Sequence, residues 1–150
     1  ADIASPADPR VIHASVATFI TDLRMVTPDI ALQRRAIFRA YAMLSSNDPA
    51  TTKTNVWLNG TEDSSPFKRA ATETVSIEII SVIPQTPETW QVDWNETTYD
   101  RQGHSAVTPF KMRALLTIYS VGSTANTTEE QIRNNPLGIY INDYSWSKQV

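Results

Sequence analysis

The spacing of apolar residues divides the chain into a helix-forming first half and a strand-forming second half. From residue 8 onward, apolar side chains first recur three and four positions apart, the spacing of one helix face. Asp8 is a good N-cap and Pro9 a good first helical residue, so the first helix is predicted to begin there. It should end near Val26, and its apolar stripe consists of Ile12, Val16, Phe19, Ile20 and Leu23.

Two further helices are predicted before the strands begin. Thr27 and Pro28 repeat the cap-and-proline signal and open a second helix, which Asn47-Asp48-Pro49 ends. A short third helix should cover residues 51–58, because Asn59-Gly60 breaks it, and a loop is expected to follow at residues 61–66. The second helix has one apolar face, formed by Ile30, Ile37, Phe38, Tyr41 and Leu44.

From Thr72 onward, apolar and polar residues alternate, which is typical of strands with one buried face. The first strand shows this alternation up to Ile79, and the change of phase at Ile80 predicts a β-bulge. Two more strands follow and complete a meander. Their apolar faces are formed by Trp90, Val92 and Trp94, and by Phe110, Met112, Ala114, Leu116 and Ile118.

A short helix, a tight turn and a final strand close the chain. Thr127 and Glu130 have the spacing of a capping box, so the helix should run to about Asn134. Asn135-Pro136-Leu137-Gly138 fits a type I turn, because proline presets φ at the second position and glycine suits the fourth. In the strand after it, Ile139 and Ile141 share one face. Aromatic side chains on the other face indicate a surface for a partner, and that face carries Tyr140, Asn142, Tyr144 and Trp146.

Helices followed by an antiparallel sheet predict an α+β fold. We expect three N-terminal helices packed on a curved antiparallel four-stranded sheet, with a short helix before the last strand. The length of 150 residues suits one domain, which we place at residues 8–150. Residues 1–7 are small and polar and are expected to form a flexible tether.

Composition and charge exclude several classes of function. A net charge of -3 and a pI near 5.3 argue against a protein that binds nucleic acid through bulk positive charge. The chain has no cysteine, so disulfides, thiol nucleophiles and cysteine zinc sites are excluded. Its two histidines, His13 and His104, show neither triad nor metal-ligand spacing. We therefore expect no metal, no cofactor and no direct contact with nucleic acid.

A catalytic pocket is the main alternative to a role in protein contacts. Asp93 lies on the strand face opposite Trp90, Val92 and Trp94, so it should pair with Lys111 or Arg113 across a solvated face. Glu96 alone shares the parity of the inward residues. We expect Glu96 to pair with an arginine of the helices rather than to serve as an acid in an open pocket.

Two motifs, in this order of elements, resemble a known protein family. They are Asn135-Pro136-Leu137-Gly138 with the strand that follows to Trp146, and the run from Trp90 to Glu96 in the second strand. Over nearly the whole chain, this arrangement is similar to the periplasmic domain of the type IV secretion inner-membrane scaffold proteins, especially those of conjugal DNA transfer. The resemblance implies a cone of helices on a curved sheet, of the nuclear transport factor 2-like type.

The resemblance also implies a function. It indicates a non-enzymatic scaffold component of a bacterial type IV secretion channel, which acts through protein-protein contacts with other channel proteins. The domain would lie in the periplasm, anchored to the inner membrane by a helix N-terminal to Ala1. A homodimer is also implied, and apolar residues beside the core stripe of the first helix fit one: Val11, Ala14 and Met25.

In this family the Asn-Pro-x-Gly turn is associated with self-association and assembly. By that resemblance, the interaction site falls on Asn135, Pro136 and Gly138, with Leu137 at the variable position. We expect replacement of Pro136 or Gly138 to weaken assembly more than folding. The alternative is a small-molecule-binding or catalytic domain of the same cone fold that uses its interior pocket.

Overall fold

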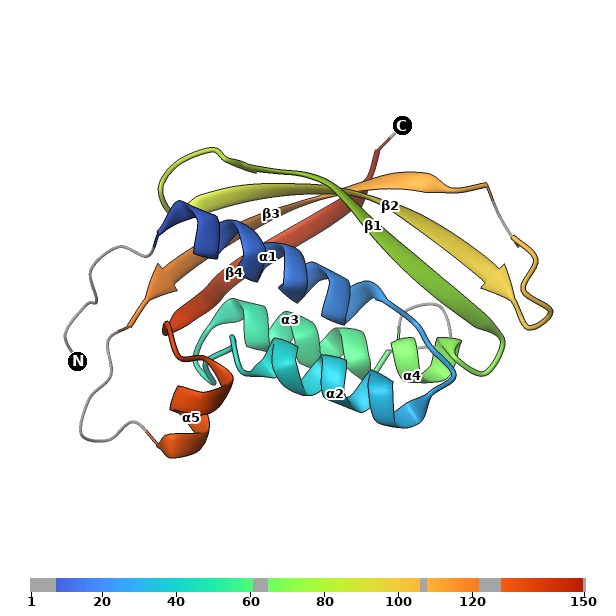
Figure 1. Ribbon diagram of the computed structural model, residues 1–150, viewed down its shortest axis with the longest axis horizontal. Coiled ribbons are helices and arrows are strands. Elements are labelled where there is room, and N and C mark those ends of the chain that lie inside the picture. Colours follow the sequence, from blue (N-terminus) through green and yellow to red (C-terminus); the bar gives the residue numbers. More distant parts are fainter. Residues whose placement is uncertain (1–7, 61–64, 106–107, 122–127, 150) are drawn as a thin grey trace.

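The computed structural model describes residues 8–60, 65–105, 108–121 and 128–149 of the chain. The expected tether and Thr127 of the expected capping box lie outside these ranges. Helices come first and strands after them, as predicted (Figure 1). In chain order the elements are α1 (Pro9–Arg24), α2 (Ile30–Tyr41), α3 (Pro49–Leu58), α4 (Pro66–Arg69), β1 (Glu73–Pro84), β2 (Thr89–Asp100), β3 (Phe110–Ser120), α5 (Glu129–Asn134) and β4 (Ile139–Lys148).

The first helix, α1, begins and buries its stripe as the sequence predicts. The Asp8 carboxylate caps it by accepting a hydrogen bond of 2.9 Å from the backbone N–H of Arg10. The helix packs against β1 and β2 and ends at Arg24, after which Val26 forms an antiparallel bridge with Val75 of β1. All five residues of the predicted stripe are buried: Ile12, Val16, Phe19, Ile20 and Leu23.

The start, the end and the buried face of α2 differ from the prediction. The helix ends at Tyr41, well before Asn47-Asp48-Pro49. Asp29, not Thr27, is the N-cap, and its carboxylate accepts from the backbone N–H of Leu32. Gln33 is buried because its amide accepts from the Thr27 N–H and donates to the Met25 carbonyl, which ties the helix to the end of α1. This orientation turns two residues of the predicted face outward, and the buried face is Gln33, Ala36, Ile37 and Ala40. The exposed pair is Ile30 and Phe38, with exposed fractions of 62% and 53%.

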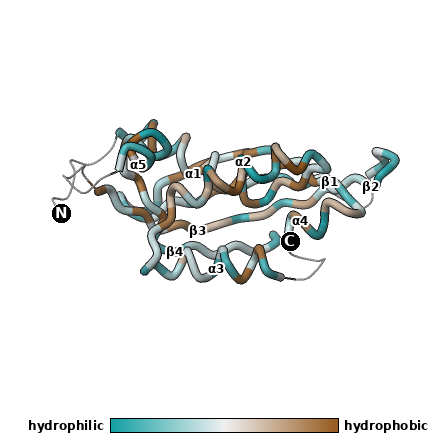
Figure 2. Tube along the Cα trace, turned by 90° about the horizontal axis from the view of Figure 1, so that it is seen from below, coloured by the Kyte–Doolittle hydropathy of each residue, from teal (hydrophilic) through white to brown (hydrophobic). Residues whose placement is uncertain are grey.

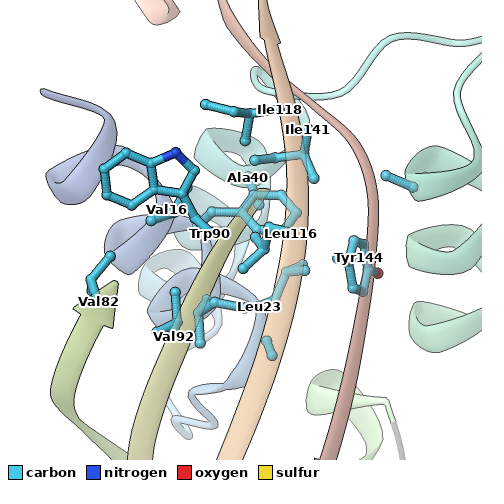
Figure 3. Packing of buried hydrophobic residues seen from close by; sticks show 14 of the residues in the cluster. Val16, Leu23, Ala40, Val82, Trp90, Val92, Leu116, Ile118, Ile141 and Tyr144 are labelled. Atoms are coloured by element: carbon cyan, nitrogen blue, oxygen red, sulfur yellow. The ribbon is translucent and has the colours of Figure 1, made fainter. Parts of the chain in front are cut away.

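The four strands form one antiparallel sheet in the order β1-β2-β3-β4. The predicted bulge is present, because pairing passes from Ile79 opposite Trp94 to Ser81 opposite Asp93 and leaves Ile80 as the extra residue. The sheet curves over the helices (Figure 1). Its inner face supplies most of the core, and Figure 3 shows Trp90, Val92 and Leu116 of the sheet beside Val16 and Leu23 of α1.

The last strand departs from the predicted alternation. Thr117 pairs with Asp143 but Ile118 pairs with Ile141, so Asn142 is an extra residue in β4. A bulge inverts the side-chain phase beyond it. Tyr144 is therefore buried and Trp146 packs against the core, so the prediction that both face outward is wrong. Tyr140, before the bulge, keeps its predicted face.

The remaining helices flank the sheet. α1 and α2 lie together, while α3 runs along β4 (Figure 2). The short helix α4 begins at Pro66, which was predicted as loop, and α5 ends at Asn134 as predicted and stands at one end of the molecule. None of the helices in the described part of the chain is long and apolar enough to span a membrane.

Candidate interaction site

The predicted turn joins α5 to β4. The backbone N–H of Gly138 donates to the carbonyl of Asn135 at 3.1 Å, which closes a turn with Pro136 and Leu137 at its centre. Leu137 is 54% exposed and Pro136 is also exposed. Apolar surface is thus displayed at the tip of a turn whose two ends are held by hydrogen bonds.

Gly138 is required by its backbone conformation and by its surroundings. Its φ of +64° lies in the left-handed region that side chains other than glycine rarely adopt. A Cβ at this position would lie 2.0 Å from the carbonyl oxygen of Val121, whose own N–H donates to the Gly138 carbonyl at 2.8 Å. The geometry gives Gly138 a role in folding. That its replacement weakens assembly more than folding stays a prediction.

Asn135 fastens the turn to the end of α2. Its side-chain amide donates to the carbonyls of Ala42 at 3.0 Å and Ile139 at 2.8 Å, and its side-chain oxygen accepts from the Ile139 N–H at 3.2 Å. Next to it, the Ile141 N–H donates to the Met43 carbonyl. The contact to Ala42 spans 93 positions of sequence, and the turn motif alone carries no signal for it.

A groove of about 250 Å³ lies beside the turn. Ala14 and Thr18 of α1 line one side, and residues 134–137 line the other. The predicted turn site and one of the three predicted dimer residues, Ala14, are therefore neighbours. The other two, Val11 and Met25, are half-buried, and Val11 packs against the core.

The groove also contains an ion pair. Arg39 donates to both carboxylate oxygens of Asp22, at 3.2 and 2.9 Å. Burial raises the pKa of Asp22, and the hydrogen bonds from Arg39 oppose this shift. Because the two charges compensate each other, the groove and the turn offer a partner mostly apolar and neutral polar surface.

The interior of the domain contains a buried ion pair. Glu96 is wholly buried and accepts hydrogen bonds from Arg24 Nε and Nη2 at 2.6 and 2.9 Å. Trp94 Nε1 donates to the same carboxylate at 3.0 Å. The Arg24 guanidinium in turn lies 4.8 and 4.9 Å from the ring centroids of Trp57 and Trp146. The predicted pairing of Glu96 with a helix arginine is confirmed.

The outer face of the sheet carries the predicted cross-strand pair, although Asp93 is buried there and not solvated as expected. Asp93 lies opposite Arg113, which donates to it at 2.8 Å, and Lys111 is 3.9 Å away. The hydrogen bond from Arg113 lowers the pKa of Asp93. Both histidines are exposed, and within the described ranges no cluster of three metal-ligating side chains occurs.

The model of the family described as "VirB8 protein" matches residues 1–149. The chain belongs to the VirB8 family. The conjugal transfer protein TrbF of Rhizobium radiobacter is 39% identical over 144 residues, which are 96% of this chain and 62% of that protein. This VirB8 family chain thus spans about three-fifths of the curated relative it matches, and the resemblance drawn from the two motifs is confirmed.

Solved structures of type IV secretion proteins share the fold of this VirB8 family domain. TrwG from Bartonella birtlesii superimposes with a TM-score of 0.79 at 13% identity, covering 99% of this chain and 97% of that one. VirB8 from Agrobacterium tumefaciens gives a TM-score of 0.74 at 16% identity, with 97% and 98% coverage. The predicted α+β fold of the nuclear transport factor 2-like type is therefore confirmed.

Proposed function

We propose that this domain is a structural assembly component of a conjugal type IV secretion channel and acts through contacts with other channel proteins. Membership of the VirB8 family and the identity to a conjugal transfer protein support the channel assignment. The site that carries the proposal is the last turn. Asn135 and Gly138 hold it by backbone and side-chain hydrogen bonds, while Pro136 and Leu137 are exposed beside a groove.

The four residues of the motif have two different roles in the proposed contact. Asn135 and Gly138 give the turn its shape, so they act on assembly through the fold. Pro136 and Leu137 provide the contact surface, and the groove beside them accommodates side chains of the partner. A second copy of the domain is one such partner, because Ala14 of α1 lines the same groove. In the whole protein, the domain lies in the periplasm and is anchored to the inner membrane by a segment outside it.

The environment of the buried Glu96 agrees with a non-catalytic role. The residue best placed to be an acid, Glu96, is held by Arg24 and Trp94 and has no exposed surface. A carboxylate that is buried and paired in this way is costly to separate from its cation and offers no open position to a substrate. This favours the assembly role over a small-molecule or catalytic function of the cone interior.

Complementation in donor cells tests the proposal. The full-length protein with Leu137→Arg is produced in cells that lack the wild-type gene, and conjugation frequency and co-purification of channel proteins are measured. Leu137→Arg should reduce both, while the free energy of unfolding of the 150-residue chain changes by less than about 0.5 kcal/mol. Wild-type transfer and co-purification with Leu137→Arg would contradict an assembly role for this turn.

A further inference from the structure

A second groove, of about 510 Å³, lies beside α5. It is bounded by the C-terminal end of α2, the adjoining ends of β3 and β4, and α5. Among the described residues, Asn134 alone lines both grooves. Aromatic rings form much of its wall, and they belong to Phe38, Tyr41, Tyr119 and Tyr140.

Ring stacking and hydrogen bonds hold the tyrosines of the aromatic wall in place. Tyr119 and Tyr140 are direct partners across β3 and β4, and their rings stack with centroids 5.6 Å apart and planes inclined by 19°. The Tyr119 hydroxyl donates to the Asp48 carboxylate, and the Tyr41 hydroxyl donates to Asn55. Phe38, although apolar, is 53% exposed. The wall therefore presents flat rings that need little reordering to bind a ligand.

Polar side chains also line the groove, and two of them bear on the choice of ligand. The Tyr140 hydroxyl has no hydrogen-bond partner among the described residues. Among the described residues that line the groove, Glu130 is the only charged one. It forms no ion pair within this part of the chain, in contrast to Glu129, which pairs with Arg133. The groove thus combines aromatic rings, a hydroxyl donor and one negative charge with neutral polar side chains such as Ser46 and Asn134.

We propose that this groove binds an extended proline-rich segment of a partner protein, with a basic residue directed to Glu130. Proline rings pack well on flat aromatic side chains, and a polyproline II segment loses little conformational entropy on binding. Its backbone carbonyls form no internal hydrogen bonds, so one can accept from the Tyr140 hydroxyl. A Lys or Arg of the segment complements Glu130. The inference goes beyond the assembly role of the turn and does not depend on it.

A peptide array tests this inference. The 150-residue chain is incubated with immobilised peptides that contain Pro-x-x-Pro repeats, with x randomised and Arg or Glu at either end, and with matched peptides in which alanine replaces proline. The proline peptides that end in Arg should bind at least about tenfold more tightly than their alanine counterparts. Equal binding of the alanine peptides, or no binding of any proline peptide, would overturn the proposal.

Variants locate the binding on the groove. Phe38→Ala and Tyr140→Phe should each weaken binding of the selected peptide about five- to tenfold, the first by loss of a ring and the second by loss of the hydroxyl alone. Phe67→Ala is the matched control, because Phe67 is also exposed, at 40%, but belongs to α4. Undiminished binding to both groove variants would place the site elsewhere and refute the assignment.

Charge reversal tests whether Glu130 selects the basic residue of the peptide. Glu130→Lys should shift the preference from peptides ending in Arg to peptides ending in Glu, whereas Glu88→Lys, at the exposed turn before β2, should not. An unchanged preference in Glu130→Lys would contradict the role of Glu130.

Leu137→Arg should leave peptide binding intact, so failure of the turn proposal and failure of the groove proposal are distinguishable. Concentration-dependent self-association that Phe38→Ala abolishes would instead identify a second copy as the occupant and overturn the proposal.

Discussion

Arg24 and Glu96 face each other inside the domain, 72 positions apart in sequence, joined by hydrogen bonds of 2.6 and 2.9 Å. The pair links the last residue of α1 to β2, and the rings of Trp57 and Trp146 flank the guanidinium. The inward-facing carboxylate of Glu96 is therefore fully occupied by Arg24 and Trp94 and has no exposed surface for a substrate. Substitutions of Arg24 or Glu96 should therefore change the stability of the domain.

Removal of one partner of this pair should destabilise the domain strongly. Arg24→Met leaves the Glu96 carboxylate buried without its cation, which typically costs about 3–5 kcal/mol. In Arg24→Met/Glu96→Gln the uncompensated charge is gone, while a side-chain oxygen remains for the Trp94 N–H. Urea unfolding should show that the double variant is more stable than Arg24→Met alone. A double variant less stable than the single one would show that the buried charge is not the cause.

Gly138→Ala should lower stability much more than Gly103→Ala. Both glycines have positive φ, +64° and +84°, so each alanine incurs backbone strain of about 1–2 kcal/mol. Only at Gly138 does the new Cβ also meet a backbone oxygen, that of Val121, whereas the space around Gly103 is open. We expect a loss of about 3 kcal/mol or more at Gly138, measured by thermal and urea unfolding. Equal losses at the two positions would rule out the steric explanation.

Stability should fall at alkaline pH because of Tyr144. Burial raises the pKa of its hydroxyl to about 12, against about 10 in an unfolded chain. Between these two values the unfolded chain releases a proton that the folded domain retains, so the free energy of unfolding decreases as pH rises from about 10 to 12. Tyr119, whose pKa burial and Asp48 also raise to about 12, acts in the same direction.

The variant Tyr144→Phe isolates the contribution of Tyr144 to this pH dependence. The variant loses the hydrogen bond between Tyr144 and Thr54 and should be less stable than the wild type at pH 8. Its stability should nevertheless decrease less steeply between pH 10 and 12, as measured by urea unfolding at a series of pH values. Identical slopes for the two proteins would mean that Tyr144 ionises normally in the folded state.

Much of the fold was predictable where a residue type has only one suitable environment. The alternation of Trp90, Val92 and Trp94 placed these side chains inside, and the same parity correctly directed Glu96 inward. The bulge at Ile80 was visible because adjacent apolar residues cannot all occupy one strand face. In these segments the wrong arrangement would expose several large apolar side chains, so the pattern is informative.

The errors concern residues that suit either environment. Tyr144 and Trp146 are stable on both faces of a strand, so alternation gave no warning that the bulge at Asn142 turns them inward. The rotation of α2 follows from the buried amide of Gln33, a residue normally placed outside. The turn at Asn135 was predictable from local preferences, but its contact with Ala42 depends on tertiary packing.

Site-specific photo-crosslinking from position 137 tests the central claim most directly. In the full-length protein within donor cells, a photoreactive amino acid replaces Leu137, which is 54% exposed, or Val56 of α3, a more accessible control that is 68% exposed. Because the turn is the proposed contact surface of the assembled channel, position 137 should yield a discrete crosslink to a channel protein or a second copy, and position 56 should not. Crosslinks at 137 no stronger than those at 56 would contradict the account.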